Sequence, residues 1–184
     1  MADRREALIV LLMGVSGAGK TTIGERLAAA LHARFQEGDA FHPSANVEKM
    51  RRGEPLTDQD RLPWLAAIAS AIGAADEAGE NAVFACSALR RSYRDILRAA
   101  SARLRIVHLS GSELLVRDRL AARRGHFMPP TLLPSQFRTL EPPDPGEQPI
   151  VVDIAAAPDV IVARICAALG HPTDDTPACA DGPR

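Results

Sequence analysis

The stretch ALIVLLMGVSGAGKTTIGERLAAALHA, residues 7–33, decides the fold. Its first seven residues form a continuous apolar run that ends at a glycine, which is typical of a parallel strand buried on both faces. Residues 14–21, GVSGAGKT, match G-x-x-x-x-G-K-[ST] in full, and a helical pattern with Ile23, Leu27 and Leu31 on one face follows. A strand, a glycine-rich loop and a helix in this order predict a phosphate-binding loop on an α/β sheet.

The residue types of this loop fit the binding of a nucleoside triphosphate. Glycines let the backbone N–H groups curl around phosphate oxygens, and the helix N-terminus adds partial positive charge. We expect Lys20 to reach the β- and γ-phosphates and the hydroxyl of Thr21 to bind Mg²⁺. The predicted nucleotide-binding residues of this stretch are Gly14, Val15, Ser16, Gly17, Ala18, Gly19, Lys20, Thr21 and Thr22.

Strands and helices alternate along the rest of the chain. Further strands are expected at 33–39, 81–88, 104–111 and 149–155, and further helices at 43–52, 60–79, 92–102, 112–125 and 158–170. We expect Asp60 to cap the long helix and Pro63 to lie in its first turn. The alternation predicts an α/β fold of the P-loop type, with a five-stranded parallel sheet between two layers of helices.

Two segments depart from this pattern. Residues 126–149 are rich in proline and polar residues, and we expect a mobile excursion with one helical turn, part of a lid over about 123–148. The tail, 171–184, is polar and is expected to be disordered. A single domain is therefore predicted over residues 1–170, which agrees with a chain of 184 residues.

Composition limits the possible partners and the cellular setting. The net charge of −1 provides no basic surface for nucleic acid or anionic lipid. The three cysteines include no C-x-x-C pair, so a reduced, cytoplasmic setting is expected, with Cys86 and Cys166 as small buried side chains. The apolar run near the N-terminus is too short and too poorly flanked for a signal peptide, and no stretch is long enough to span a membrane.

Other residues distinguish among classes of P-loop protein. A GTPase switch needs D-x-x-G after a strand and N-K-x-D later, but Asp76–Gly79 falls at the end of a helix and N-K-x-D is absent. A motor or transport ATPase usually has an acidic residue at the end of a hydrophobic strand, where this chain has Cys86 and Ser87. Both classes are therefore disfavoured.

A small-molecule kinase needs a carboxylate near the acceptor hydroxyl and a basic lid over the phosphates. The second strand ends at Glu37-Gly38-Asp39, on the same sheet edge as the phosphate loop. Arg119, Arg123 and Arg124 precede the proline-rich excursion, where they would stabilise charge on the transferred phosphoryl group. A closed lid also excludes water, which competes as an acceptor.

The chain resembles the small P-loop gluconokinases, a family related in fold to shikimate and nucleoside monophosphate kinases. The matching stretches run in order over about residues 8–170: LLMGVSGAGKTT, GDAFHPSANVEKMRRGEPLTDQDRLPWL, CSALRRSYRDILR, LAARRGHFMPPTLLPSQFRTLEPP and VVDI. The phosphate loop alone is widespread, whereas GDAFHPSANVEKM and GHFMPPTLLPSQF are far more specific. Two departures stand out: Glu37 replaces a frequent Asp, and Arg90 replaces a common Lys.

The resemblance implies ATP-dependent phosphorylation of D-gluconate to 6-phospho-D-gluconate, with Mg²⁺, by a cytoplasmic homodimer. It places Asp39 beside the attacking hydroxyl, together with Lys20, Arg123 and Arg124 as catalytic residues. Glu37 joins Thr21 near Mg²⁺, and Arg119 joins the nucleotide site. The implied acceptor residues are Asp39, His42, Asn46, Lys49, Arg61, Ser87 and Arg94, with Arg61 on the substrate carboxylate.

Some residues and the function itself still allow alternatives. Lys49 also fits a solvated helix face, and Arg61 also fits a surface pair with Asp58 or Asp60. Trp64 is either a packing residue or a pocket wall. The competing functions are a kinase of the same fold for another sugar acid, polyol or nucleotide, and a nucleotide-binding regulator without catalysis.

Overall fold

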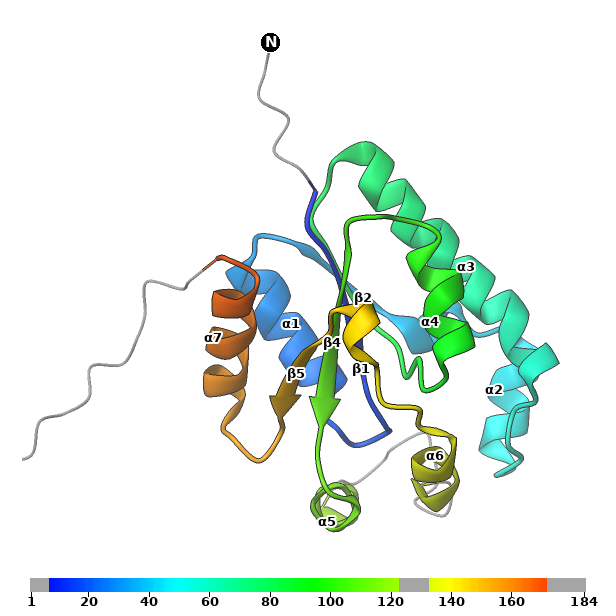
Figure 1. The fold of residues 1–184 in the computed structure, drawn as a ribbon. Helices are drawn as coiled ribbons and strands as arrows, with labels where there is room; N and C mark the ends of the chain where they lie inside the picture. The colour runs from blue at the N-terminus through cyan, green and yellow to red at the C-terminus, as the bar shows by residue number, and fades with distance from the viewer. Residues whose placement is uncertain (1–6, 123–132, 172–184) are drawn as a thin grey trace, which may run out of the picture.

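The structure, a computed structural model, describes residues 7–122 and 133–171. A five-stranded parallel sheet has the order β2-β3-β1-β4-β5. Helices α1 and α7 cover one face of the sheet, and α3 and α4 cover the other (Figure 1). The predicted three-layer α/β fold is therefore confirmed.

The elements are bounded as follows. The strands are β1 (Ile9–Met13), β2 (Arg34–Glu37), β3 (Ala82–Ala85), β4 (Leu104–Ser110) and β5 (Ile150–Asp153). The helices are α1 (Lys20–Ala30), α2 (Ser44–Arg51), α3 (Asp58–Ala78), α4 (Arg91–Arg98), α5 (Glu113–Ala122), α6 (Leu133–Thr139) and α7 (Pro158–Ala168). Two short 3₁₀ helices are η1 (Gly38–Phe41) and η3 (Pro145–Glu147).

The central strand explains why its sequence is apolar without alternation. Every residue of β1 is fully buried. Val10 and Leu12 pack into the core shared with α1 and α7, whereas Ile9, Leu11 and Met13 pack into the core shared with α3 and α4. A parallel strand between two helical layers has no solvent face, so both sets of side chains must be hydrophobic. Cys86 and Cys166 are free and buried in these cores, as expected.

Helix α3 begins earlier than the sequence predicts. Thr57 is its N-cap, and its side chain accepts a hydrogen bond from the backbone N–H of Asp60. The Asp60 carboxylate in turn accepts the backbone N–H of Thr57, which completes a capping box. The prediction that Asp60 caps the helix is therefore wrong, because Asp60 is the third helical residue, and Pro63 falls in the second turn.

The segments beyond the C-terminal end of the sheet gather around one region. Helices α2, α5 and α6 lie toward that end, at the bottom of Figure 1. Within the expected excursion, α6 extends over seven residues, longer than the single turn expected. The part of this excursion at 126–132 lies outside the described residues, as does most of the expected tail. In the described parts of the chain, no helix is long and apolar enough to cross a membrane.

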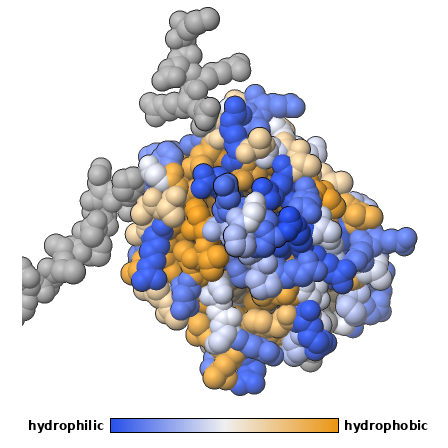
Figure 2. Space-filling model, in the orientation of Figure 1, coloured by the Kyte–Doolittle hydropathy of each residue, from blue (hydrophilic) through white to orange (hydrophobic). Residues whose placement is uncertain are grey.

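Hydrophobic and hydrophilic side chains are mixed over the surface. Figure 2 shows hydrophobic residues gathered over α7 and β5. Val151 of β5 and Val160 of α7 are exposed there. Strand β5 is also an edge of the sheet, so its outer backbone has no neighbouring strand.

Candidate active site

The phosphate loop joins β1 to α1 at the middle of the sheet. Gly19 immediately precedes α1 in the left-handed conformation, with φ of 96°, which residues other than glycine rarely adopt. Helix α1 starts at Lys20, whose Nζ donates hydrogen bonds to the carbonyl oxygens of Gly14 at 3.0 Å and Val15 at 3.1 Å. The ammonium group therefore lies over the loop, where a bound phosphate would meet it.

The two predicted metal residues are brought together. Thr21 Oγ1 donates a hydrogen bond to Glu37 Oε2 at 2.6 Å, joining the first turn of α1 to the end of β2. Hydroxyl and carboxylate oxygens suit Mg²⁺, which keeps several waters and takes few protein ligands in kinases. The described residues contain no cluster of three or more His, Cys, Asp or Glu that could hold a metal. The pair therefore fits Mg²⁺.

Asp39 is held in place through its neighbour Gly38. A Cβ on Gly38 would lie only 2.3 Å from the carbonyl oxygen of Ala85, so glycine is needed where η1 passes the end of β3. The indole Nε1 of Trp64 donates a hydrogen bond to the Gly38 carbonyl at 2.7 Å. Asp39 itself is exposed and lines the cavity described below.

Trp64 also positions His42. The two rings are stacked, with centroids 4.2 Å apart and planes 12° from parallel. Burial lowers the pKa of His42, and the nearby Asp39 carboxylate only partly opposes this effect. The imidazole is therefore neutral near pH 7, so it can both donate and accept hydrogen bonds. Trp64 is at once a buried packing residue and a wall of the cavity.

Asn46 and Lys49 of α2 bind the start of α3. The Asn46 amide donates a hydrogen bond to the backbone carbonyl of Asp60 at 2.7 Å. Lys49 Nζ lies 2.8 Å and 2.9 Å from the two carboxylate oxygens of Asp60, and this contact is the main reason that the pKa of Asp60 falls to about 2. Neither residue lines the cavity, although the Asn46 amide nitrogen lies 3.5 Å from Nδ1 of His42, which does.

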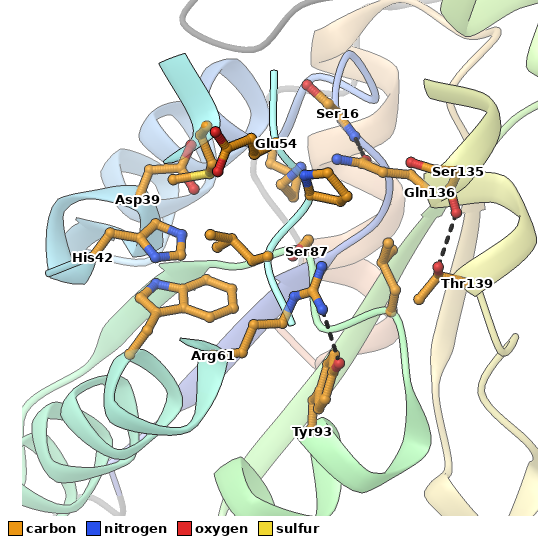
Figure 3. A pocket seen from close by; sticks show the side chains of 16 residues that line it. Ser16, Asp39, His42, Glu54, Arg61, Ser87, Tyr93, Ser135, Gln136 and Thr139 are labelled. Atoms are coloured by element: carbon orange, nitrogen blue, oxygen red, sulfur yellow. Dashed lines mark hydrogen bonds between the residues drawn. The ribbon is translucent and has the colours of Figure 1, made fainter. Parts of the chain in front are cut away.

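A cationic cluster lies across the cavity from Asp39. Arg61 of α3 lines the cavity, and its guanidinium lies 5.8 Å from the centroid of the Tyr93 ring (Figure 3). Arg90, just before α4, lies 5.9 Å from the same centroid. Asp58 is shared among these residues: Tyr93 Oη donates to it at 2.5 Å and Arg90 Nη1 at 2.7 Å.

Most of the predicted acceptor residues line one cavity. It opens to solvent and has a cavity volume of about 100 Å³. Its lining comprises Ser16, Lys20, Asp39, His42, Met50, Glu54, Pro55, Leu56, Arg61, Trp64, Ser87, Leu89, Tyr93, Ser135, Gln136 and Thr139. Figure 3 shows the polar members facing a common space between the phosphate loop and α3.

The contribution of α6 to the cavity is not predicted by the sequence. Ser135, Gln136 and Thr139 of this helix line the cavity opposite Asp39 and His42 (Figure 3). Gln136 Oε1 accepts a hydrogen bond from the backbone N–H of Ser16 at 2.6 Å, which joins α6 to the phosphate loop. These residues belong to the LLPSQF part of a stretch already notable for its composition, but no periodic pattern there identifies the side that faces the loop.

The remaining arginines that the sequence predicts for the site differ in their positions relative to the cavity and the phosphate loop. Arg119 of α5 lies beside the phosphate loop, since a Cβ on Gly19 would be 3.9 Å from its Nη1, and its guanidinium also donates to the carbonyl oxygen of Ile154. Arg123 and Arg124 lie outside the described residues. Arg94 is buried and does not line the cavity.

The guanidinium of Arg94 donates hydrogen bonds to a carboxylate and to backbone carbonyls. Its Nε and Nη2 donate to the two carboxylate oxygens of Glu147 at 2.6 Å and 2.8 Å. Its Nη1 lies within hydrogen-bond distance of three backbone carbonyls, those of Ala88, Leu89 and Glu141. Arg94 thus fastens the segment after α6 to α4, next to the cavity residue Leu89.

Comparisons with known proteins agree with this geometry. A family model described as an AAA domain matches residues 9–143. A gluconokinase of Gluconobacter oxydans (strain 621H) is 50% identical over 156 residues, which cover 85% of this chain and 88% of that protein. The crystal structure of a gluconokinase from Sinorhizobium meliloti 1021 is 45% identical and covers 90% of this chain and 93% of its own, with a TM-score of 0.80.

A more distant likeness shows the fold alone. A shikimate kinase structure from Bacteroides thetaiotaomicron has a TM-score of 0.66 at 17% identity, over 89% of this chain and 98% of its own. The predicted relation in fold to shikimate kinases is thereby confirmed. Since its relatives at high identity match over most of both chains, this chain belongs to the gluconokinase family.

Proposed function

We propose that this chain is a kinase that transfers the γ-phosphoryl group of ATP to D-gluconate, giving 6-phospho-D-gluconate. The observation that carries this proposal is the cavity whose walls include Lys20 of the phosphate loop, Asp39, and the cationic Arg61. A sugar acid has hydroxyl groups for one side of such a cavity and a carboxylate for the cation. Family membership supports the same acceptor.

The phosphate loop and α1 supply the donor side. Lys20 would move from the loop carbonyls to the β- and γ-phosphates, where its charge offsets the charge of the transferred group. Thr21 and Glu37 would hold Mg²⁺, directly or through water. When bound, the metal would neutralise phosphate charge. Arg119 lies beside the same loop and is proposed to join the nucleotide site.

The end of β2 supplies the acceptor side. Asp39 would accept a hydrogen bond from the attacking hydroxyl, orienting it toward the γ-phosphate and taking its proton as the bond to phosphorus forms. Neutral His42 and the Ser87 hydroxyl would bind further hydroxyls of the substrate. Asn46 and Lys49 support this wall from behind through Asp60. Arg61 would bind the substrate carboxylate.

Helix α6 lies within the predicted lid, of which residues 133–148 are described. Its contact with Ser16 through Gln136 supports closure of this helix over the phosphate loop. A closed helix there would exclude water from the reacting groups, which limits hydrolysis of ATP. Arg123 and Arg124 remain proposed catalytic residues that precede this helix in the sequence.

We also propose that the protein is a cytoplasmic homodimer. The exposed Val151 and Val160, on the edge strand β5 and on α7, support an interface on that side. The free, buried Cys86 and Cys166 support a reduced setting. Light scattering on the purified protein would test the homodimer, and a Val151→Lys/Val160→Lys variant should shift a dimer toward monomer.

The proposed reaction is tested by ADP release with MgATP, with and without D-gluconate. Shikimate, glucose, glycerate and nucleoside monophosphates serve as competing acceptors. Strong stimulation by gluconate alone is expected, with 6-phospho-D-gluconate identified as the product. Stimulation by another acceptor would overturn the substrate assignment, and ATP binding without stimulation by any acceptor would favour the regulator.

A further inference from the structure

The carboxylate of Asp58 has three candidate partners and does not bind them equally. It accepts hydrogen bonds from Tyr93 Oη at 2.5 Å and from Arg90 Nη1 at 2.7 Å. Arg61 Nη1, one helical turn away in α3, forms a longer ion pair with the same carboxylate at 3.5 Å. Asp58 is thus held more closely by Tyr93 and Arg90 than by its neighbour in α3.

This distribution leaves Arg61 loosely held. Its guanidinium makes a long hydrogen bond from Nη1 to Tyr93 Oη at 3.4 Å and an ion pair with Asp58 at 3.5 Å, both through Nη1. Figure 3 shows it pointing from α3 toward Tyr93 at the cavity wall. A guanidinium has five N–H donors in a fork that matches a carboxylate. Most of the donor capacity of Arg61 therefore remains for a ligand in the cavity that it lines.

The charges of the cluster lead to the same conclusion. Two guanidinium groups flank the Tyr93 ring, at 5.8 Å and 5.9 Å from its centroid, and a single carboxylate lies between them. Because the two cations share one carboxylate and Arg90 is the closer of them, the positive charge of Arg61 is only partly balanced. Without Arg90, the Asp58 carboxylate would move closer to Arg61 and neutralise its positive charge. Asp58 thus competes with a substrate carboxylate for the guanidinium of Arg61.

We propose that Arg90 and Tyr93 are positioning residues that set specificity for an acidic acceptor, because their shorter contacts with Asp58 weaken its ion pair with Arg61 and so keep Arg61 available for the substrate carboxylate. This inference rests on the proposed function and extends it to residues that need not touch the substrate. It predicts that Arg90 acts through Asp58. The effect of losing Arg90 should therefore depend on whether Asp58 is charged.

The test compares steady-state kinetics of Arg90→Ala with those of the wild type. We expect the KM for gluconate to rise about tenfold, the scale of one lost charge-assisted hydrogen bond, with kcat within about twofold. Inhibition by D-glucitol, which has the same hydroxyl chain without the carboxylate, should be unchanged. Arg90→Lys should stay close to the wild type, because it keeps a cation on Asp58.

The decisive variant is Arg90→Ala/Asp58→Asn. Removing the charge of Asp58 removes the competitor, so the KM for gluconate should return to within about threefold of the wild type. If Arg90 instead contacts the substrate directly, or only stabilises the fold, the second substitution will not restore binding, and the proposal is overturned. A KM that is unchanged in Arg90→Ala also overturns it.

Two controls establish whether the effect is specific to Arg90 and distinct from the proposed reaction. Arg26→Ala breaks a comparable surface ion pair with Asp159, with side chains 48% and 86% exposed against 40% and 55% for the Arg90–Asp58 pair. It should leave the KM for gluconate unchanged, and a similar rise there would overturn the specific role of Arg90. If the wild type does not phosphorylate gluconate at all, the proposed function fails; if it does and Arg90→Ala behaves normally, only this inference fails.

Discussion

Replacing Arg94 with methionine should destabilise the protein far more than replacing any surface arginine. The side chains of Arg94 and Glu147 are 1% and 0% exposed, and the two form a bidentate pair. Methionine has a similar length but leaves the Glu147 carboxylate buried without its partner, and three carbonyl groups lose a donor. Removing one member of a buried ion pair typically costs about 3–5 kcal/mol. For a chain of this size that loss corresponds to a fall in Tm of roughly 6–20 °C.

Urea denaturation followed by far-UV circular dichroism measures the change in unfolding free energy. Arg91→Met is the matched control in the same helix, because Arg91 pairs with Asp144 at the surface, with side chains 53% and 42% exposed, where an ion pair contributes about 0–1 kcal/mol. A second variant, Arg94→Met/Glu147→Leu, removes both charges and should recover part of the loss. The reasoning is refuted if Arg94→Met costs no more than Arg91→Met.

Three further predictions concern the cavity and the core. Lys20→Ala should lower kcat roughly 10²–10³-fold, since the transferred phosphate loses its cation, and single-turnover kinetics with near-normal rates would contradict the assignment of the phosphate loop. Asp39→Asn should leave the Kd for ATP nearly unchanged while kcat falls at least about a hundredfold; a variant that only binds ATP more weakly would place Asp39 at the metal instead. Burial lowers the pKa of both His42 and His108, so the unfolded chain binds more protons between these lowered values and the ordinary pKa of about 6.5. The Tm should therefore fall as the pH drops from about 7.5 to 5.5, and His108→Gln should flatten that fall; a Tm that is constant or rises over this range would show that the histidines do not contribute.

The fold could be predicted because its signals are local. The apolar run of β1 and the G-x-x-x-x-G-K-T loop each lie within one short window, and each requires its conformation for a physical reason that a single residue type reveals. The placement of Glu37 with Thr21 came from the resemblance to the gluconokinases, and the structure brings the two side chains into a hydrogen bond. The strand and the loop needed only the local sequence.

The remaining features depend on contacts between distant residues. Arg94 has an ordinary helical sequence around it, and only the fold shows that Glu147, 53 residues later, is buried against it. Gln136 reaches Ser16 across 120 residues of sequence. The start of α3 was misjudged for a local reason: Thr57 and Asp60 are both good capping residues, and their reciprocal hydrogen bonds place the boundary at Thr57.

The strand order has an evolutionary consequence. Strand β1 is central, with β3 and then β2 on one side and β4 on the other. Asp39 follows β2 and Ser87 follows β3, whereas α5 and α6 follow β4. Asp39 and Ser87 therefore follow different strands from the phosphate loop, so substitutions at these two positions need not alter that loop. Such substitutions can change the acceptor of a kinase with this fold while its nucleotide-binding loop stays the same.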